Sequence, residues 1–169
     1  MTASPDNLYI GKGIVTFQPT GATTARDLGE VPEFEFTPSI ETLDYFSSRA
    51  GVRQKVKSVV VQRGGTLRVV MNEFTAQNLA LAIGGTITQN TALEDVIAIL
   101  ATNAIEGVVT FTGSNEVGRQ MVAVFNKVSF PPAGSLGLIS DEWGQIEING
   151  EVLADNSGDF GTITVGTLA

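Results

Sequence analysis

Alternating apolar and polar residues predict a chain built mainly of short β-strands. The clearest alternation begins at residue 33, where Phe34 and Phe36 fall on one face while Glu33, Glu35 and Thr37 fall on the other. A register shift of one residue would bury two carboxylates, so the register of this strand is strongly determined. We predict that the phenylalanine face packs on the core.

Similar patterns predict strands along most of the remaining chain. In the segment 143–153, Ile146, Ile148 and Val152 alternate with polar residues that include Glu147 and Glu151. Nineteen glycines, together with many valines, threonines and isoleucines, favour short strands and tight turns. The predicted strands are 8–18, 26–38, 66–72, 107–112, 119–130 and 143–153, with 160–165 as a last short strand or a tail.

One short helix is predicted at about 75–84. Thr75 is a good N-cap, and Gly84 with the glycine after it ends the helix. Phe74 and Leu79 occupy the two positions of a hydrophobic staple. A helix this short needs an apolar face on a sheet, and we assign Phe74, Leu79 and Ile83 to that packing.

The segment 86–103 is ambiguous. Residues 91–94 match a capping box, which would make 94–101 helical, but the apolar run 96–100 is equally typical of a buried strand. Periodicity does not separate the two structures in so short a run. We favour a strand, because the chain beyond it carries strand signals throughout.

A long arm is predicted between two antiparallel strands, bracketed by Pro38 and Gly51. Its apolar residues have no regular period, which is typical of a loop, and a β-branched run at 56–62 returns the chain to the second strand. Two interpretations stay open: the arm contacts another molecule, or it folds back on its own sheet. The apolar residues concerned are Leu43, Tyr45, Phe46 and Val52.

Charge separates this region from the rest of the chain. Six of the ten basic residues lie within twenty positions, whereas the net charge of the whole chain is −8. A basic arm on an acidic body is a plausible device for joining copies of one protein head to tail. The six residues are Arg49, Arg53, Lys55, Lys57, Arg63 and Arg68.

The length and composition of the chain predict one domain spanning 1–169, with flexible ends at 1–6 and about 155–169. A hydrophobic content of 43% and a charged content of 17% are typical of a globular chain. A net charge of −8 disfavours nucleic-acid binding. The first residues lack the pattern of a signal peptide, and no apolar run reaches about 18 residues, so we expect a cytoplasmic product without membrane insertion.

Catalytic and metal sites have little support. The chain has no histidine and no cysteine, so the commonest general base and the thiol nucleophile are missing. Glu33 with Glu35, or Asp141 with Glu147, would be nominal glycosidase pairs, but strand alternation already explains the first pair. Asp141 and Glu142 beside Glu147 could bind calcium or form an ordinary acidic loop. We expect no enzyme activity, no cofactor and no metal.

The phosphate-loop interpretation of Gly11-Lys12-Gly13 is weaker still. The segment is too short for a phosphate-binding loop and lacks the following hydroxyl residue and helix. The two glycines instead indicate a bulge or a close approach of two backbones.

Several segments resemble one known family. The runs 28–34 and 41–53, with Glu-Thr-Leu-Asp-Tyr-Phe-Ser-Ser at 41–48, resemble the major tail tube protein of long-tailed, siphovirus-like bacteriophages and related gene transfer particles. Residues 78–81, 141–144 and 150–153 fit as well. The similarity covers roughly residues 7 to 160.

The resemblance implies a tail tube fold, an antiparallel β-sandwich or barrel with one outer helix and an arm between the second and third strands. It also implies hexameric rings that stack around a tape measure protein, bounded by tail terminator and distal tail proteins. The protein would be made in the bacterial host's cytoplasm and would reside in the virion tail.

The resemblance also assigns roles to residues. DNA would pass through the lumen without specific binding, which suits an acidic bore. Glu33, Glu35 and Thr37 would face that lumen. The arm would contact the adjacent ring through Leu43, Tyr45, Phe46, Arg49, Val52, Arg53, Lys55 and Lys57.

Two alternatives stay open. A tube subunit of a type VI secretion-like injection machine would carry a similar fold and similar self-association. A carbohydrate-binding or hydrolytic β-sandwich would instead act as a monomer on a glycan.

Overall fold

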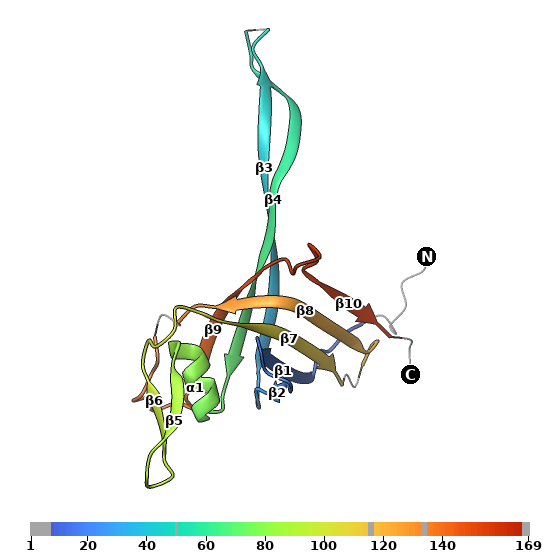
Figure 1. Cartoon of the computed structure of the whole chain (residues 1–169). Helices are drawn as coiled ribbons and strands as arrows, with labels where there is room; N and C mark the ends of the chain where they lie inside the picture. The colour runs from blue at the N-terminus through green and yellow to red at the C-terminus, as the bar shows by residue number, and fades with distance from the viewer. Residues whose placement is uncertain (1–7, 50, 115–116, 133–134, 167–169) are drawn as a thin grey trace.

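The computed structural model describes residues 8–49, 51–114, 117–132 and 135–166 and shows a mainly β protein (Figure 1). Eight strands form one antiparallel sheet in the order β2-β1-β7-β8-β9-β4-β3, with β10 also paired to β8, while β5 and β6 form a separate pair. The elements are β1 Gly13–Pro19, β2 Arg26–Asp27, β3 Glu33–Ser47, β4 Gln54–Met71, α1 Ala76–Ile83, β5 Thr86–Gln89, β6 Asp95–Ala98, β7 Ile105–Gly113, β8 Met121–Phe130, β9 Ile146–Val152 and β10 Gly161–Val165.

The large sheet folds back on itself around a single core cluster. Only two residue pairs join β8 to β9, so the sheet can turn sharply there. As a result, β3 lies against strands that are distant in the sheet order: the Phe34 ring stacks on Phe111, and Phe36 meets Phe125, with 5.6 Å and 5.1 Å between ring centroids. The buried cluster between the two layers includes Phe17 and Phe130, packed edge to face.

The period-two predictions for β3 and β9 are confirmed. Phe34 and Phe36 pack against the core cluster, while Glu33, Glu35 and Thr37 are exposed. In β9, buried and exposed residues alternate at every position, so Ile146, Ile148 and Val152 face inward as predicted. Inward positions are apolar because a carboxylate there would lose its hydration without a partner.

The predicted helix is confirmed as α1. The Thr75 side chain accepts a hydrogen bond from the Asn78 N–H, and Gly84 adopts a left-handed conformation with φ of 61°. Leu79 and Ile83 pack on the core cluster. Phe74 does not join them in the core: it is exposed at the surface, and its ring lies against Gly144, where the missing side chain leaves room.

Segment 86–103 forms a small hairpin of β5 and β6. The strand that we favoured is confirmed for 95–98, but it is not buried, because this pair stands beside α1 at the surface (Figure 1). The capping-box residues form the turn instead of starting a helix. There the Asn90 side chain accepts the Glu94 N–H, and Leu93 takes a positive φ of 63°.

Several strand boundaries differ from the predictions. The first strand begins at residue 13 instead of 8, and Ile10 forms only an isolated bridge to Val117. The extended segment 26–38 is broken at Gly29, which has a φ of 82°. Residues 161–165 lie in an end predicted to be flexible, but the alternative prediction of a last short strand at 160–165 is confirmed, because they form β10 on β8. Residues 1–6 lie outside the described residues.

Candidate functional site

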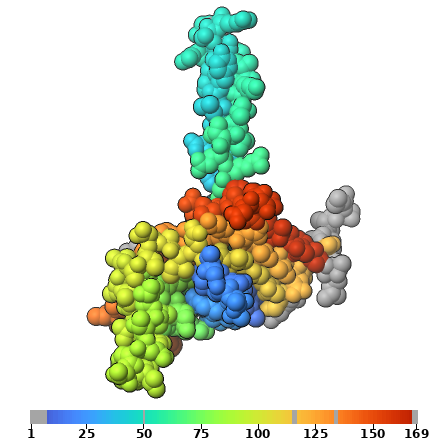
Figure 2. Space-filling model, in the orientation of Figure 1, coloured from blue at the N-terminus to red at the C-terminus, as the bar shows by residue number. Residues whose placement is uncertain are grey.

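The largest candidate site is the arm, here defined as residues 38–63 of the β3–β4 hairpin. The loop predicted between Pro38 and Gly51 is wrong, because β3 and β4 pair continuously from the body to Ser47 and Gln54. The hairpin stands clear of the body as a two-stranded ribbon (Figures 1 and 2). The arm contains ten residues of each strand, 38–47 and 54–63, which at roughly 3.3 Å each span about 33 Å before the turn.

One face of this ribbon, here called the apolar face, carries three exposed apolar side chains and a lysine, and Phe46 and Val60 are exposed on the other face. Leu43 lies opposite Val59, and Tyr45 lies opposite Lys57, so these four side chains share a face. Leu43 is 68% exposed and Tyr45 is 67% exposed. At the turn, Val52 is 77% exposed. Of the two interpretations left open, folding back on the subunit's own sheet is therefore wrong, while contact with another molecule stays a prediction.

The other face of the arm satisfies its own polar groups. The Asp44 carboxylate forms an ion pair of 2.7 Å with Lys55 and accepts a hydrogen bond of 2.6 Å from Ser58. Lys55 first and Ser58 second lower the pKa of Asp44 below its ordinary value. Lys55 is thus engaged within its own arm, whereas Lys57 projects from the apolar face. Phe46 lies opposite Lys55, next to an irregularity in the register.

The charge split predicted from sequence coincides with the division into arm and body. The arm contains five basic and two acidic residues, a net charge of +3, which leaves −11 for the other residues of a chain whose total is −8. Arg49 and Arg53 lie exposed at the end of the arm. The arm is therefore the positively charged part of this subunit, and two of its arginines lie at the end farthest from the acidic body.

A second candidate surface is the acidic face, the outward side of β3, β4 and β9. Glu33 and Glu35 project from β3 on this face, and Glu147 and Glu151 project from β9. Thr37 lies on the same face, opposite Thr66. The face thus joins carboxylates from strands that are more than a hundred residues apart in the sequence.

Arg68 lies at the centre of the acidic face. Its guanidinium donates two hydrogen bonds to Glu147, at 3.0 and 2.9 Å, and forms an ion pair with Glu33. Glu147 first and Glu33 second raise the pKa of Arg68, and Arg68 lowers the pKa of Glu147. Sequence reasoning grouped Arg68 with the arm. The alternation of β4 could have placed it on the carboxylate face, because Leu67 and Val69 beside it are buried.

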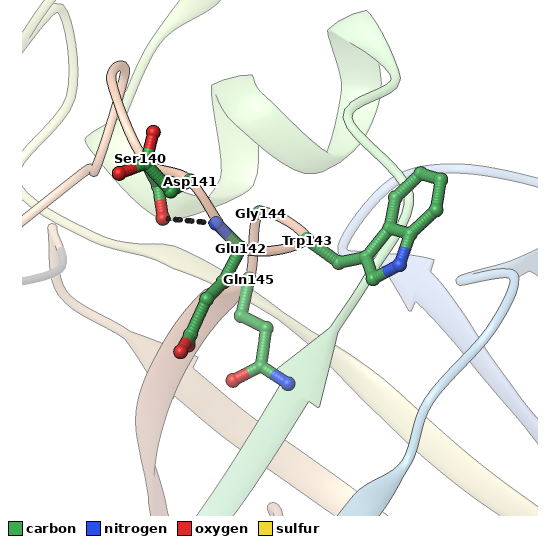
Figure 3. A pocket seen from close by; sticks show the side chains of 6 residues that line it. All are labelled: Ser140, Asp141, Glu142, Trp143, Gly144 and Gln145. Atoms are coloured by element: carbon green, nitrogen blue, oxygen red, sulfur yellow. Dashed lines mark hydrogen bonds between the residues drawn. The ribbon is translucent and has the colours of Figure 1, made fainter.

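A third surface is the pole loop, here defined as residues 138–144, which precedes β9. Ile139 and Trp143 are 98% and 95% exposed. Together with Gln145, residues 140–144 of the loop line a shallow hollow (Figure 3). The Trp143 side chain points away from those of Glu142 and Gln145. The Glu142 N–H donates a hydrogen bond to the Ser140 hydroxyl oxygen. Sequence reasoning weighed the carboxylates of this segment, used 141–144 in the resemblance and began a strand at 143, but it missed the exposed apolar side chains.

The structure gives little geometry for catalysis or metal binding. Glu147, nominally paired with Asp141, is held by Arg68. Among the described residues, no group of three or more carboxylates is placed to hold a metal ion.

At Gly13, a side chain would meet the Thr112 carbonyl oxygen at 2.3 Å, which confirms the predicted close backbone approach.

Comparison with known proteins adds a family without a described activity. Within the described ranges, no helix has the length and apolar character that crossing a membrane requires. A search of curated proteins gave no match to the chain. A family model described as "Protein of unknown function UCP028589" matches residues 8–95 and 90–163. Because the match covers most of the chain, the protein belongs to this family.

Proposed function

We propose that the protein is a self-assembling tube subunit, the major tail tube protein of a long-tailed phage or a related particle. In this proposal, hexameric rings of the subunit stack around a tape measure protein. Tail terminator and distal tail proteins close the two ends. The finished tube, part of the virion tail, conducts DNA to the host.

The observation that carries the proposal is the exposed arm. An isolated two-stranded hairpin is only marginally stable in water, and strands of 15 and 18 residues exceed the usual length. Large apolar side chains on both strands of the arm are exposed, and burying one such side chain contributes about 1.5–3 kcal/mol. Contact with another molecule would bury these side chains and would thereby stabilise a hairpin of this length.

The charge pattern favours a second copy as that other molecule. A basic arm and an acidic body belong to the same chain, so each copy offers both halves of a complementary contact. A contact between unlike surfaces propagates from copy to copy instead of closing after two. Irregularities in the β3–β4 register after Glu41 and Tyr45 twist the ribbon and oppose unspecific edge pairing.

The sheet edges and the acidic face support the tubular form. Strands β2 and β3 end the strand order, and a closed ring of subunits would supply partners for such edges. A lumen lined by Glu33 and Glu35 would repel phosphates, so that DNA passes without being held. Arg68 neutralises only part of this face, because at least four carboxylates project from it.

Shortening the arm tests the proposal. Glu41 and Gln62 are opposite each other, so joining them through Asn-Gly removes residues 42–61 and leaves a two-residue hairpin turn. The removed side chains lie outside the core, so thermal unfolding of the body should change little. We expect the wild type to form tubes in negative-stain electron microscopy and the shortened variant to stay monomeric.

A matched control changes apolar surface elsewhere. Replacing the exposed Leu93 and Val96 of the β5–β6 hairpin by serine should leave tube formation intact. Tubes built by the shortened variant, or a wild type that stays monomeric at every concentration, would refute the proposal.

Reversing Arg49 and Arg53 to glutamate should weaken stacking, and added salt should weaken it in the wild type.

A further inference from the structure

We propose that the pole loop is the surface on which the arm of a second copy docks. The inference rests on the proposed function and adds to it the receiving surface. The occupant is the apolar face of the arm, with Leu43, Tyr45, Lys57 and Val59.

The pole loop lies at the end of the body opposite the arm. Strand β4 leaves the arm at Gly65 and runs through the body to Met71, where its partner is Ile146, the first residue of β9. The loop directly precedes Ile146, so the body strands separate it from the base of the arm (Figure 1). One copy therefore carries an arm at one pole and this loop at the other, which is the arrangement a head-to-tail stack requires.

The chemistry of the two surfaces is complementary. Leu138, Ile139 and Trp143 are exposed apolar side chains in the pole loop, and Asp141 and Glu142 lie between them. The arm presents apolar side chains beside a lysine. Contact would bury apolar groups of both copies and would place the lysine near two carboxylates and an indole ring, which attracts cations.

The length of the arm favours contact with the pole loop through the flank of the arm and not through its tip. The body strand from Gly65 to Met71 spans about 20 Å, which is shorter than the roughly 33 Å of the paired strands of the arm. If the tip met the pole loop, the two bodies would stand apart by the whole arm and most apolar residues of the arm would stay in water. If the middle of the arm, at Leu43 and Tyr45, meets the pole loop, the outer part of the arm lies along the neighbour's body and more of its apolar side chains are covered.

Trp143 supplies an intrinsic probe, because it is the only tryptophan of the chain. We expect a red-shifted emission spectrum and strong acrylamide quenching in dilute subunits. On assembly, the emission should shift to the blue and the quenching constant should fall severalfold. Tubes in which Trp143 remains freely quenched would overturn this inference while leaving the proposed function intact.

Cysteine pairs locate the contact, since the natural chain contains no cysteine. Leu43→Cys protein mixed with Ile139→Cys protein should form a disulfide-linked dimer under mild oxidation. Val52→Cys at the tip should give far less product with Ile139→Cys, as should Leu43→Cys with the matched exposed site Leu93→Cys. Equal cross-linking to Leu93→Cys, or preferred cross-linking at the tip, would overturn the inference.

The two failures are distinguishable. If wild-type subunits never assemble, both the proposed function and this inference are refuted. If tubes form but show neither burial of Trp143 nor the Leu43–Ile139 cross-link, only the assignment of the pole loop fails.

Discussion

Replacing Asn78 by alanine should destabilise the subunit severely. Asn78 is 1% exposed, and its side-chain nitrogen donates hydrogen bonds to the carbonyl oxygens of Leu28, at 2.9 Å, and Glu73, at 3.0 Å. Its oxygen accepts a hydrogen bond of 2.6 Å from Arg26. This one amide therefore ties helix α1 to the segment after β2 and to the turn that precedes the helix.

The expected loss follows from the partners that the substitution leaves unsatisfied. Each neutral hydrogen bond contributes about 1 kcal/mol and a bond to a charged group about 2 kcal/mol, which together make about 4 kcal/mol. Arg26 also donates to the carbonyl oxygen of Gln77 and lies partly at the surface, so water recovers part of its loss. We expect the free energy of unfolding to fall by about 3 kcal/mol.

Urea unfolding followed by circular dichroism measures this loss at a concentration too low for assembly. With a slope of about 2 kcal/mol per molar urea, the midpoint should fall by about 1.5 M. The matched control is Gln77→Ala, which removes an exposed amide from the same helical turn and should leave the midpoint nearly unchanged. A loss below about 1 kcal/mol for Asn78→Ala, or a loss equal to that of the control, would refute the reasoning.

Three further predictions concern the register and the charged clusters. Gly107→Ala should lower the free energy of unfolding by about 2 kcal/mol or more, because its methyl group would lie 2.2 Å from a backbone oxygen of β1; an unchanged melting temperature would contradict this. The pKa of Asp44 is lowered in the folded arm, so the stabilisation is present above its ordinary pKa and is lost as the pH falls through the folded pKa. A carboxyl titration by NMR should show this, and Lys55→Met should raise that pKa, whereas an unmoved titration would exclude the pair. In Arg68→Met the pKa of Glu147 should rise, since Arg68 is the main cause of its lowering, and the same titration checks it.

Local features of the sequence were enough to predict the elements whose signals are local. The N-cap at Thr75 and the left-handed glycine at 84 act within one helical turn, so both ends of α1 were predictable. In β9, alternation identified the buried face because each inward position is packed and each outward one is hydrated. For 86–103, the apolar run was too short for its period to distinguish a helix from a strand. The strand is decided by the pairing of β5 with β6.

The candidate surfaces depended more strongly on tertiary pairing. The arm was predicted as a loop because its apolar residues have no period, yet backbone pairing across irregularities in register keeps β3 and β4 extended as far as Ser47. Alternation could place Arg68 on the outward face of β4, but its pairing with Glu147 depends on β9 lying beside β4. The exposure of Trp143 continues the alternation of β9, because residues 143, 145 and 147 are all exposed.

By itself, the amino-acid sequence determined the strand-rich character, the inward face of β3 and β9, the limits of α1 and the concentration of positive charge around residues 49–68. Each of these follows from interactions between near neighbours or from composition. Only the tertiary structure decided the folding of the sheet onto itself, the length of the arm and the placement of the pole loop opposite it. These features depend on hydrogen bonds and packing between residues distant in the chain, and no local pattern encodes which distant strand will supply the partner.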